Sequence, residues 1–195
     1  MNDHPPSQTD SRSALDRTNW VNFATTVLAR DGLAGVRIES LARELNVTKG
    51  SFYWHFRDRQ ALLNAIIAEW KTARLHELQL EAPRTPAEAE AQIHAIIDRY
   101  STRPDADRLL LELAIRDWAR RDSHVANIVE QVDVARQARA TRLFEMAGFA
   151  PEEARNRALL MFTHVFGLSM MMFEHSISED LAARHEAIAR LICRK

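Results

Sequence analysis

The sequence predicts an all-α fold with a helix-turn-helix near its N-terminus. Along most of the 195 residues, apolar side chains recur at three- and four-residue steps, which is the spacing of one face of a helix. The segments between these stretches are short and contain Gly, Pro, Asp or Ser, residues typical of helix ends and turns. No segment shows the strict alternation expected of a half-buried strand. With 46% hydrophobic residues, the chain can bury a core of its own.

Three helices are expected before residue 58. The first carries an apolar stripe and ends near Asp31 and Gly32, because glycine commonly ends a helix; the stripe consists of Trp20, Phe23, Ala24, Val27 and Leu28. The second, a short helix, carries the stripe Ile38, Leu41, Ala42 and Leu45 and ends at Asn46 and Val47. Thr48 is a hydroxyl residue of the kind that caps a helix, so a third helix should begin at Lys49. Two short helices at a sharp turn form a helix-turn-helix.

The remaining helices are expected in sequence along residues 59–195. Asp58 is a plausible N-cap for a long connecting helix that runs toward Leu80. Thr85 should cap a further helix, which Pro86 opens at its first position. After a break near Pro104, helices are expected over 109–121, 125–147 and 151–174, followed by a last helix capped by Ser178.

The third helix has an outer face suited to nucleic acid. Phe52 and Phe56 face inward, which leaves polar or amphipathic groups outside, on Thr48, Lys49, Ser51, Tyr53, Trp54 and His55. The second helix of a helix-turn-helix lies in the major groove, and cations, hydroxyls and free amides at its start hold phosphates. Gly50 would let the backbone approach closely. The alternative is that the aromatic cluster is core. Residues 53–55 cannot all face inward, although Trp54 alone is compatible with either packing or DNA contact.

The distribution of charge supports this interpretation, while the total does not. The net charge is only −1, which taken alone argues against a nucleic-acid-binding protein. However, residues 11–60 hold eight Lys and Arg against five Asp and Glu, whereas residues 61–195 hold eighteen against twenty. The basic excess therefore lies on the predicted DNA-binding module. Because this excess is modest, local placement of the charges must matter more than the global field.

Residues 47–56, Val-Thr-Lys-Gly-Ser-Phe-Tyr-Trp-His-Phe, followed by Arg59 and by Ala-Leu-Leu at 61–63, resemble the recognition helix and the start of the next helix in the TetR family of transcriptional regulators. The resemblance is strong over about residues 12–70 and weaker over 116–149. It implies an all-α homodimer with an N-terminal three-helix DNA-binding domain and a C-terminal helical domain for dimerisation and ligand binding. These domains would span 13–58 and 59–195, after a disordered lead-in at 1–12.

The resemblance also implies roles for individual residues. Tyr53 and His55 match positions that usually hold phosphates, and Lys49 matches a position that contacts the backbone or bases. Arg59 stands where the family usually has a lysine near the phosphates, which keeps the charge. Arg37 stands where a threonine or serine is frequent, so a longer cationic contact would replace a hydroxyl one. The residues expected to contact DNA are Arg37, Thr48, Lys49, Gly50, Ser51, Tyr53, Trp54, His55 and Arg59.

An apolar cavity is expected among the C-terminal helices. Such a cavity with a few polar groups would suit a small, flat, hydrophobic effector. The candidates to line it are Trp70, Tyr100, Trp118, Met161, Phe162, His164 and Phe166. The alternative is that these methionine and aromatic residues are ordinary core, and that His164 bonds to a backbone carbonyl.

The helix that begins at Pro151 is expected to contact a second copy of the chain. Residues 159–173 are apolar nearly all round, so every side of this stretch must be covered. The last two helices of both subunits would then make a four-helix interface, formed by Gly167, Met170, Met171, Leu181, His185, Ile188 and Ile192. The alternative is that Gly167 and Ser169 merely bend an internal helix.

No enzymatic, metal or cofactor site is expected. The five glycines make neither a dinucleotide fingerprint nor a phosphate loop, and there is no His-Glu-x-x-His and no cysteine pair. The single Cys193 suits a reducing cytoplasm. Residues 1–13 lack the apolar stretch of a secretory signal, and the longest apolar stretch, 158–173, is too short to span a bilayer.

The sequence therefore predicts a transcriptional regulator in the cytoplasm. The expected mechanism is repression at a palindromic double-stranded DNA operator, with release by a small hydrophobic effector. Two alternatives stay open: a DNA-binding protein of the same fold without an effector, and a helical protein-interaction module.

Overall fold

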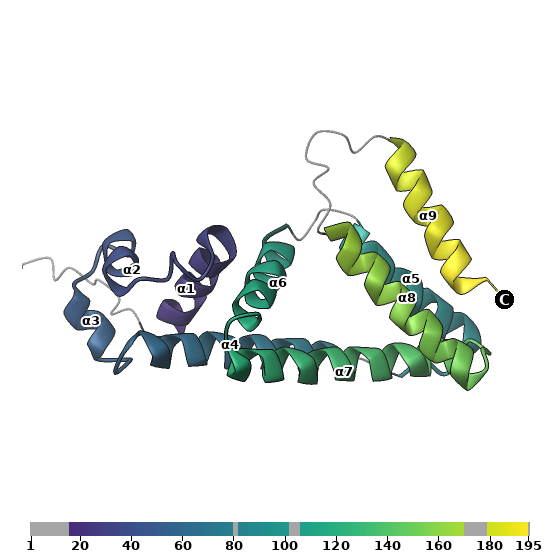
Figure 1. The fold of residues 1–195 in the computed structure, drawn as a ribbon, viewed down its shortest axis with the longest axis horizontal. Helices are drawn as coiled ribbons and strands as arrows, with labels where there is room; N and C mark the ends of the chain where they lie inside the picture. Colours follow the sequence, from purple (N-terminus) through teal and green to yellow (C-terminus); the bar gives the residue numbers. More distant parts are fainter. Residues whose placement is uncertain (1–15, 80–81, 102–105, 170–178, 195) are drawn as a thin grey trace, which may run out of the picture.

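The computed structural model describes residues 16–79, 82–101, 106–169 and 179–194, and its regular structure over these ranges is helical (Figure 1). This confirms the all-α prediction. The helices are α1 (Arg17–Asp31), α2 (Ile38–Glu44), α3 (Lys49–Tyr53), α4 (Arg59–Glu77), α5 (Pro86–Ser101), α6 (Ala106–Ala119), α7 (Ser123–Met146), α8 (Pro151–Ser169) and α9 (Glu179–Cys193).

Local capping signals set several of these boundaries. The Asp58 carboxylate accepts a hydrogen bond from the backbone N–H of Ala61 at 2.8 Å, and the Thr85 hydroxyl accepts one from Glu88 at 3.2 Å. Both predicted caps are thereby confirmed. The predicted lead-in at 1–12, the cap at Ser178 and the extension of α8 from 170 to 174 lie outside the described residues.

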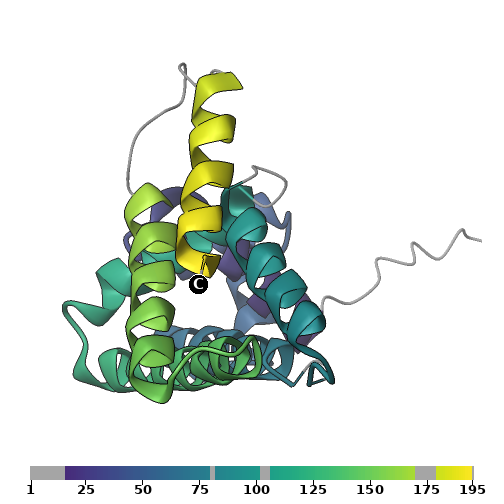
Figure 2. The same cartoon turned by 90° about the vertical axis from the view of Figure 1, so that its right-hand side faces the viewer.

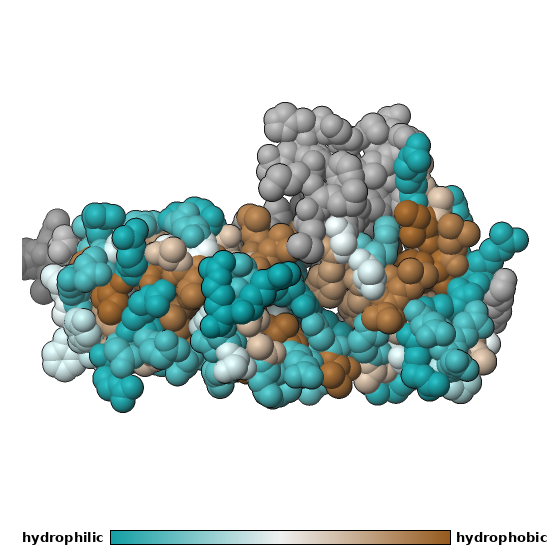
Figure 3. Space-filling model, in the orientation of Figure 1, coloured by the Kyte–Doolittle hydropathy of each residue, from teal (hydrophilic) through white to brown (hydrophobic). Residues whose placement is uncertain are grey.

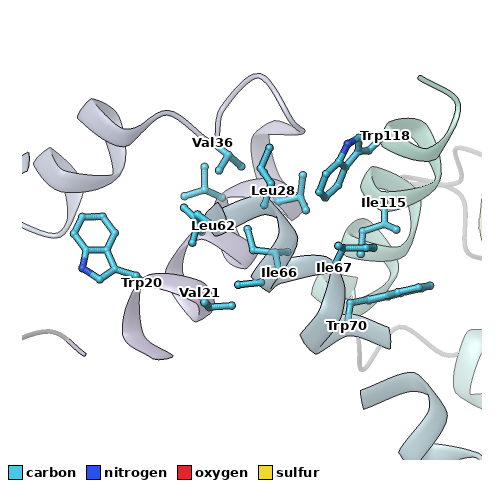
Figure 4. Close-up of a cluster of buried hydrophobic side chains, with 14 of the residues drawn as sticks. Trp20, Val21, Leu28, Val36, Leu62, Ile66, Ile67, Trp70, Ile115 and Trp118 are labelled. Carbon is cyan, nitrogen blue, oxygen red and sulfur yellow. The ribbon is translucent and has the colours of Figure 1, made fainter. Parts of the chain in front are cut away.

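The first hydrophobic core joins the helix-turn-helix to α4, α6 and the first half of α7. Leu28 of α1 and Ile66 of α4 are fully buried in it, and Ile115 and Trp118 of α6 close its other side (Figure 4). This core continues past the predicted domain boundary at residues 58 and 59. Packing therefore does not separate the three N-terminal helices from α4 and α6, and the boundary stays a prediction.

The second core lies at the other end of the molecule. It combines α5, the second half of α7, α8 and α9. Figure 2 shows α5 and α8 rising from α7, with α9 seen between them and extending further up. Ile93, Phe144 and Met161 are fully buried here. Because α7 contributes to both cores, it connects the two ends of the molecule.

Candidate nucleic-acid interface

The turn between α2 and α3 fixes the angle at which α3 leaves the core. Asn46 has φ 55°, the left-handed conformation in which Asn is one of the few favourable residues. Its N–H donates to Arg43 O at 3.1 Å, and the N–H of Val47 donates to Ala42 O at 2.9 Å. This pair of bonds is a Schellman motif. Thr48 follows as the N-cap residue of α3, although its side chain makes no capping bond.

Aromatic packing determines which face of α3 is turned inward. Phe52 is fully buried, and its ring lies edge-on to Trp20 with centroids 5.3 Å apart. Phe56, just beyond α3, stacks on Phe52 at 5.5 Å. The opposite face carries Tyr53, which is 57% exposed, and Trp54, which is 87% exposed. These exposures exclude the alternative that Trp54 packs into its own chain.

The polar groups predicted to contact DNA surround these two aromatic residues. Arg37, Thr48, Lys49 and Gly50 are exposed, while Ser51 and His55 are half-buried. Lys49 Nζ lies 2.5 Å from a carboxylate oxygen of Glu39 on α2. This hydrogen bond is the main cause of a lowered pKa at Glu39. Both side chains are more than half exposed, so the pair adds little stability and can open when a phosphate competes.

Gly50 is not required by the internal packing of the protein. A Cβ placed there would meet only Thr48 Oγ1, at 3.5 Å, which is an ordinary contact distance, and φ lies outside the left-handed region. Because the fold would accept a side chain, any need for glycine at this position must come from outside the chain. A partner that approaches the backbone of α3 would create that need.

Arg59 differs from the other predicted contacts because it already bonds within the protein. Its Nε donates to Val36 O at 2.5 Å, and an Nη donates to Leu33 O at 2.7 Å. It therefore ties the α1–α2 turn to the start of α4. A phosphate contact by Arg59 would require these bonds to break.

Arg57 is a candidate that sequence reasoning did not single out. Its side chain is 88% exposed and pairs with Asp58 at 2.9 Å. It lies between the aromatic face of α3 and the start of α4. Its position directly after the apolar Phe56 was the available sign in the sequence that Arg57 is exposed near α3.

Comparison with known proteins assigns this motif to a family. The family described as "Bacterial regulatory proteins, tetR family" matches residues 22–66, which include α2, α3 and the Schellman turn. The chain belongs to the TetR family. The match runs from α1 into the first half of α4 and includes none of the helices from α5 onward.

Curated relatives extend the likeness beyond this segment, and solved structures share the fold. AcrR from Shigella flexneri is 23% identical over 71% of this chain and 62% of its own length. The class D tetracycline repressor protein from Escherichia coli is 32% identical over 35% of this chain and 31% of its own length. The chain thus spans less than two thirds of these relatives. A proposed regulator from Saccharomonospora viridis, in complex with choline, superposes with a TM-score of 0.69 at 16% identity, over 92% of this chain and 96% of that one. This match shows the shared fold.

The residues predicted to bind an effector in this TetR-family chain are divided between the two cores. Trp70 and Trp118 belong to the first core, whereas Met161 and Phe162 belong to the second. His164 and Phe166 are half-buried, and the side chain of Tyr100 lies outside the described residues. Their role in ligand binding stays a prediction.

A separate cleft of about 660 Å³ lies between α6 and α7. It is lined by small apolar side chains and by polar or charged ones, namely Ala119, Ala126, Val129 and Val134 with Arg116, Arg120, Glu130, Asp133 and Gln137. None of the seven residues predicted to bind an effector lines this cleft. It falls within the size range of small-molecule sites.

The predicted dimer face is partly described. Gly167 is exposed, and a Cβ there would meet nothing within 4 Å. Ile188 is half-buried, and Ile192 is only 2% exposed because it packs into its own second core. Met170 and Met171, and the side chains of Leu181 and His185, lie outside the described residues.

Sequence reasoning missed the leucines that are exposed on these helices. Leu159 and Leu160 of α8 are 60% and 54% exposed, and Leu191 of α9 is 65% exposed. Hydrophobic surface gathers over α8 and α9 in the view of Figure 3. The continuous apolar character of α8 was a signal for these positions, since one helix cannot bury every face within a single chain.

Among the residues that the structure describes, no group of His, Cys, Asp and Glu is arranged to hold a metal ion. Over the same residues, no helix has the length and apolar character needed to cross a bilayer.

Proposed function

We propose that this chain is a transcriptional regulator that binds operator DNA as a homodimer through the outer face of α3. The observation that carries the proposal is the 87% exposure of Trp54 beside the half-exposed Tyr53, on a helix that the Schellman turn and Phe52 hold rigidly. The Tyr53 ring packs edge-on against Phe52 at 5.3 Å but stays more than half exposed, and Trp54 is almost fully exposed, so both are suited to a partner surface. The polar neighbours Thr48, Lys49 and Ser51 favour phosphates and base edges over an apolar protein surface.

The homodimer supplies two such helices. Leu159, Leu160 and Leu191 are exposed in the single chain, and a two-fold interface would cover the same leucines on both subunits. Gly167 allows a partner helix to approach closely, since a Cβ at this position would meet nothing within 4 Å among the described residues. A two-fold dimer predicts a pseudo-palindromic operator, because each α3 reads one half-site.

Repression with release by a small molecule is the regulatory mode that we propose, with the protein in the cytoplasm and without enzymatic activity. The cleft between α6 and α7 supports an effector, since α6 packs against α1 of the DNA-binding module. A same-fold protein without an effector would bind the same DNA, but no small molecule would change its affinity. A protein-interaction module would not bind duplex DNA.

The two described lysines of the chain provide a matched test of the DNA interface. Lys49 lies on α3, whereas Lys71 lies on α4 and bonds to Gln131 of α7. Fluorescence anisotropy on a selected duplex should show weaker binding for Lys49→Ala and a salt slope reduced by about one. Lys71→Ala should bind like the parent. Equal affinity of both variants across salt concentrations would refute the assignment of α3.

A second pair of variants tests the dimer. Leu191→Asp should place a charge in the apolar interface and give a monomer in sedimentation velocity. Leu110→Asp changes a leucine of α6 that is 47% exposed, and it should remain a dimer. A Leu191→Asp dimer as tight as the parent would contradict the proposed interface.

A further inference from the structure

Charged residues of α4, α6 and α7 form a cluster at the junction of the two hydrophobic cores. Four arginines take part, Arg74, Arg108, Arg116 and Arg136, and three carboxylates, Glu77, Glu112 and Asp133. We name this set the arginine cluster. On the buried face of α7, Arg136 stands between Val132 of the first core and Ala140 of the second.

Each carboxylate of the arginine cluster serves more than one arginine. Glu112, 2% exposed, accepts from Arg136 at 2.8 and 3.2 Å and from Arg116 at 2.9 Å. Asp133 accepts two bonds from Arg116, at 2.8 and 2.7 Å. Glu77 holds both Arg74 and Arg108. The three carboxylates are therefore shared among the N–H donors of four guanidinium groups.

The arginine cluster has a net positive charge and too few acceptors. Four guanidinium groups face three carboxylates. The Nε atoms of Arg74, Arg108 and Arg116 are buried without a hydrogen-bond partner among the described residues. Burial, followed by the neighbouring Arg108, lowers the pKa of the Arg74 guanidinium. Buried donors in a cationic site favour an added anion, because such groups are normally satisfied by an acceptor.

Aromatic rings and a cleft adjoin the same charges. The Phe166 ring of α8 lies 4.2 Å from the Arg116 guanidinium and 5.7 Å from that of Arg136. The Trp70 ring lies 5.9 Å from Arg136. Arg116 and Asp133 also line the cleft of about 660 Å³ between α6 and α7. A molecule in this cleft would therefore find apolar walls and the edge of the arginine cluster together.

We infer that the effector is a small organic oxyanion, an apolar body with one carboxylate or phosphate group, whose charge the arginine cluster binds through the α6–α7 cleft. This inference rests on the proposed function and replaces the purely hydrophobic effector that the sequence suggests. The planar guanidinium fork matches both kinds of oxyanion.

The location of the arginine cluster explains how such a ligand acts on DNA binding. Arg116 lines the cleft from α6, which packs against α1 of the DNA-binding module, and it bonds to Asp133 of α7. An oxyanion that draws Arg116 away from Asp133 alters the contact between α6 and α7. Only a ligand that prefers one arrangement of these helices shifts the equilibrium, and breaking the bonds between Arg116 and Asp133 provides that preference.

Matched acids and amides test the charge requirement. The probes are benzoate, cinnamate, 2-naphthoate and octanoate, each beside its own carboxamide, with phenyl, 2-naphthyl and octyl phosphate as the second kind of oxyanion. Calorimetric titration of the full chain should show at least one acid that binds about tenfold or more tightly than its neutral counterpart. The stronger series identifies carboxylate or phosphate as the group. If no acid or phosphate binds better than the amides, the inference is overturned.

Variants locate the binding. Arg116→Gln should weaken binding of the preferred anion about 10- to 100-fold by removing one charge-assisted interaction, and Arg116→Lys should restore part of it. Arg121→Gln is the control, because Arg121, in the turn after α6, is 72% exposed and forms an ion pair with Asp117 of α6, outside the cleft. Thermal melts of each variant check folding. Unchanged affinity in a folded Arg116→Gln protein would place the anion elsewhere and refute the site.

A separate DNA measurement distinguishes failure of this inference from failure of the proposed function. If the parent binds no duplex, the regulatory proposal fails, while the titrations still decide whether the arginine cluster binds anions. If anions bind the arginine cluster but leave DNA affinity unchanged, the effector role is refuted. Release of DNA by the anion in the parent, with a weaker response in Arg116→Gln, supports both.

Discussion

Replacing Gly50 by alanine should stabilise the protein and weaken its binding to DNA. The added Cβ would meet only Thr48 Oγ1, at 3.5 Å, and the backbone conformation is one that alanine adopts readily. At such a site the substitution stabilises by about 0.4–1 kcal/mol, because it restricts the unfolded chain. Nothing within the fold opposes it.

The loss of DNA affinity is expected to arise at the surface of α3 that faces DNA. Gly50 is the second residue of α3. At a helix N-terminus, free backbone N–H groups can donate hydrogen bonds to a phosphate. A methyl group there would hold the phosphate away from these donors. The loss of one charge-assisted hydrogen bond costs about 1.5–3 kcal/mol, which weakens the affinity about 10- to 150-fold.

Gly35 supplies the contrasting substitution in the same domain. A Cβ there would lie 2.5 Å from Asp31 Cβ and 3.3 Å from Val27 Cγ1, so Gly35→Ala should lower the melting temperature. Chemical denaturation and anisotropy titrations on one duplex would measure both variants. If Gly50→Ala binds DNA as tightly as the parent, or loses stability as Gly35→Ala does, the reasoning about close backbone approach is wrong.

Three further substitutions separate binding from folding. Trp54→Ala should leave the free energy of unfolding within about 0.5 kcal/mol of the parent, since this side chain is 87% exposed. The same variant should bind DNA more weakly in anisotropy titrations. Arg59→Gln should lower stability by about 2 kcal/mol in chemical denaturation, because Nε and an Nη lose their bonds to Val36 and Leu33 carbonyls. Glu112→Gln should destabilise by about 3 kcal/mol at neutral pH, because it removes the carboxylate that lies closest to the buried Arg136 guanidinium. Burial alone would raise the pKa of Glu112, but Arg136 and Arg116 outweigh the effect of burial and lower the pKa. The parent should therefore lose the stabilisation from Glu112 as the pH falls below about 4.5. The variant should lack this pH-dependent part of the stability.

Each of these expectations has an outcome that contradicts it. A Trp54→Ala protein that melts several degrees lower would show that Trp54 supports the fold. A fully stable Arg59→Gln protein with weak DNA binding would restore the phosphate role. Identical pH profiles of stability for the parent and Glu112→Gln would mean that this carboxylate contributes no pH-dependent stabilisation.

Features that depend on neighbouring residues were predictable from the sequence. The caps at Asp58 and Thr85 each use a backbone N–H three residues away, so the local pattern was sufficient. The burial of Phe52 and Phe56 followed from their spacing on one side of a short helix. The Schellman turn at Asn46 lies where the apolar stripe of α2 ends.

Features that depend on distant residues were not predictable. Ile192 was expected in the dimer interface, yet it packs into the second core with α5 and α8. The arginine cluster joins residues of α4, α6 and α7, and its members are separated by up to several tens of positions. A carboxylate such as Glu112 resembles an ordinary surface residue until tertiary packing brings Arg136, 24 residues away, against it.

Selection of bound sites from random duplex DNA tests the central claim most directly. The α3 interface on a two-fold dimer predicts an enriched inverted repeat, with half-site centres about 34 Å apart or at a multiple of that spacing. Sedimentation of the enriched duplex with the protein should show two chains, or a multiple of two, per site. Failure to enrich any sequence, or enrichment of a single unrepeated half-site bound by one chain, would contradict the account.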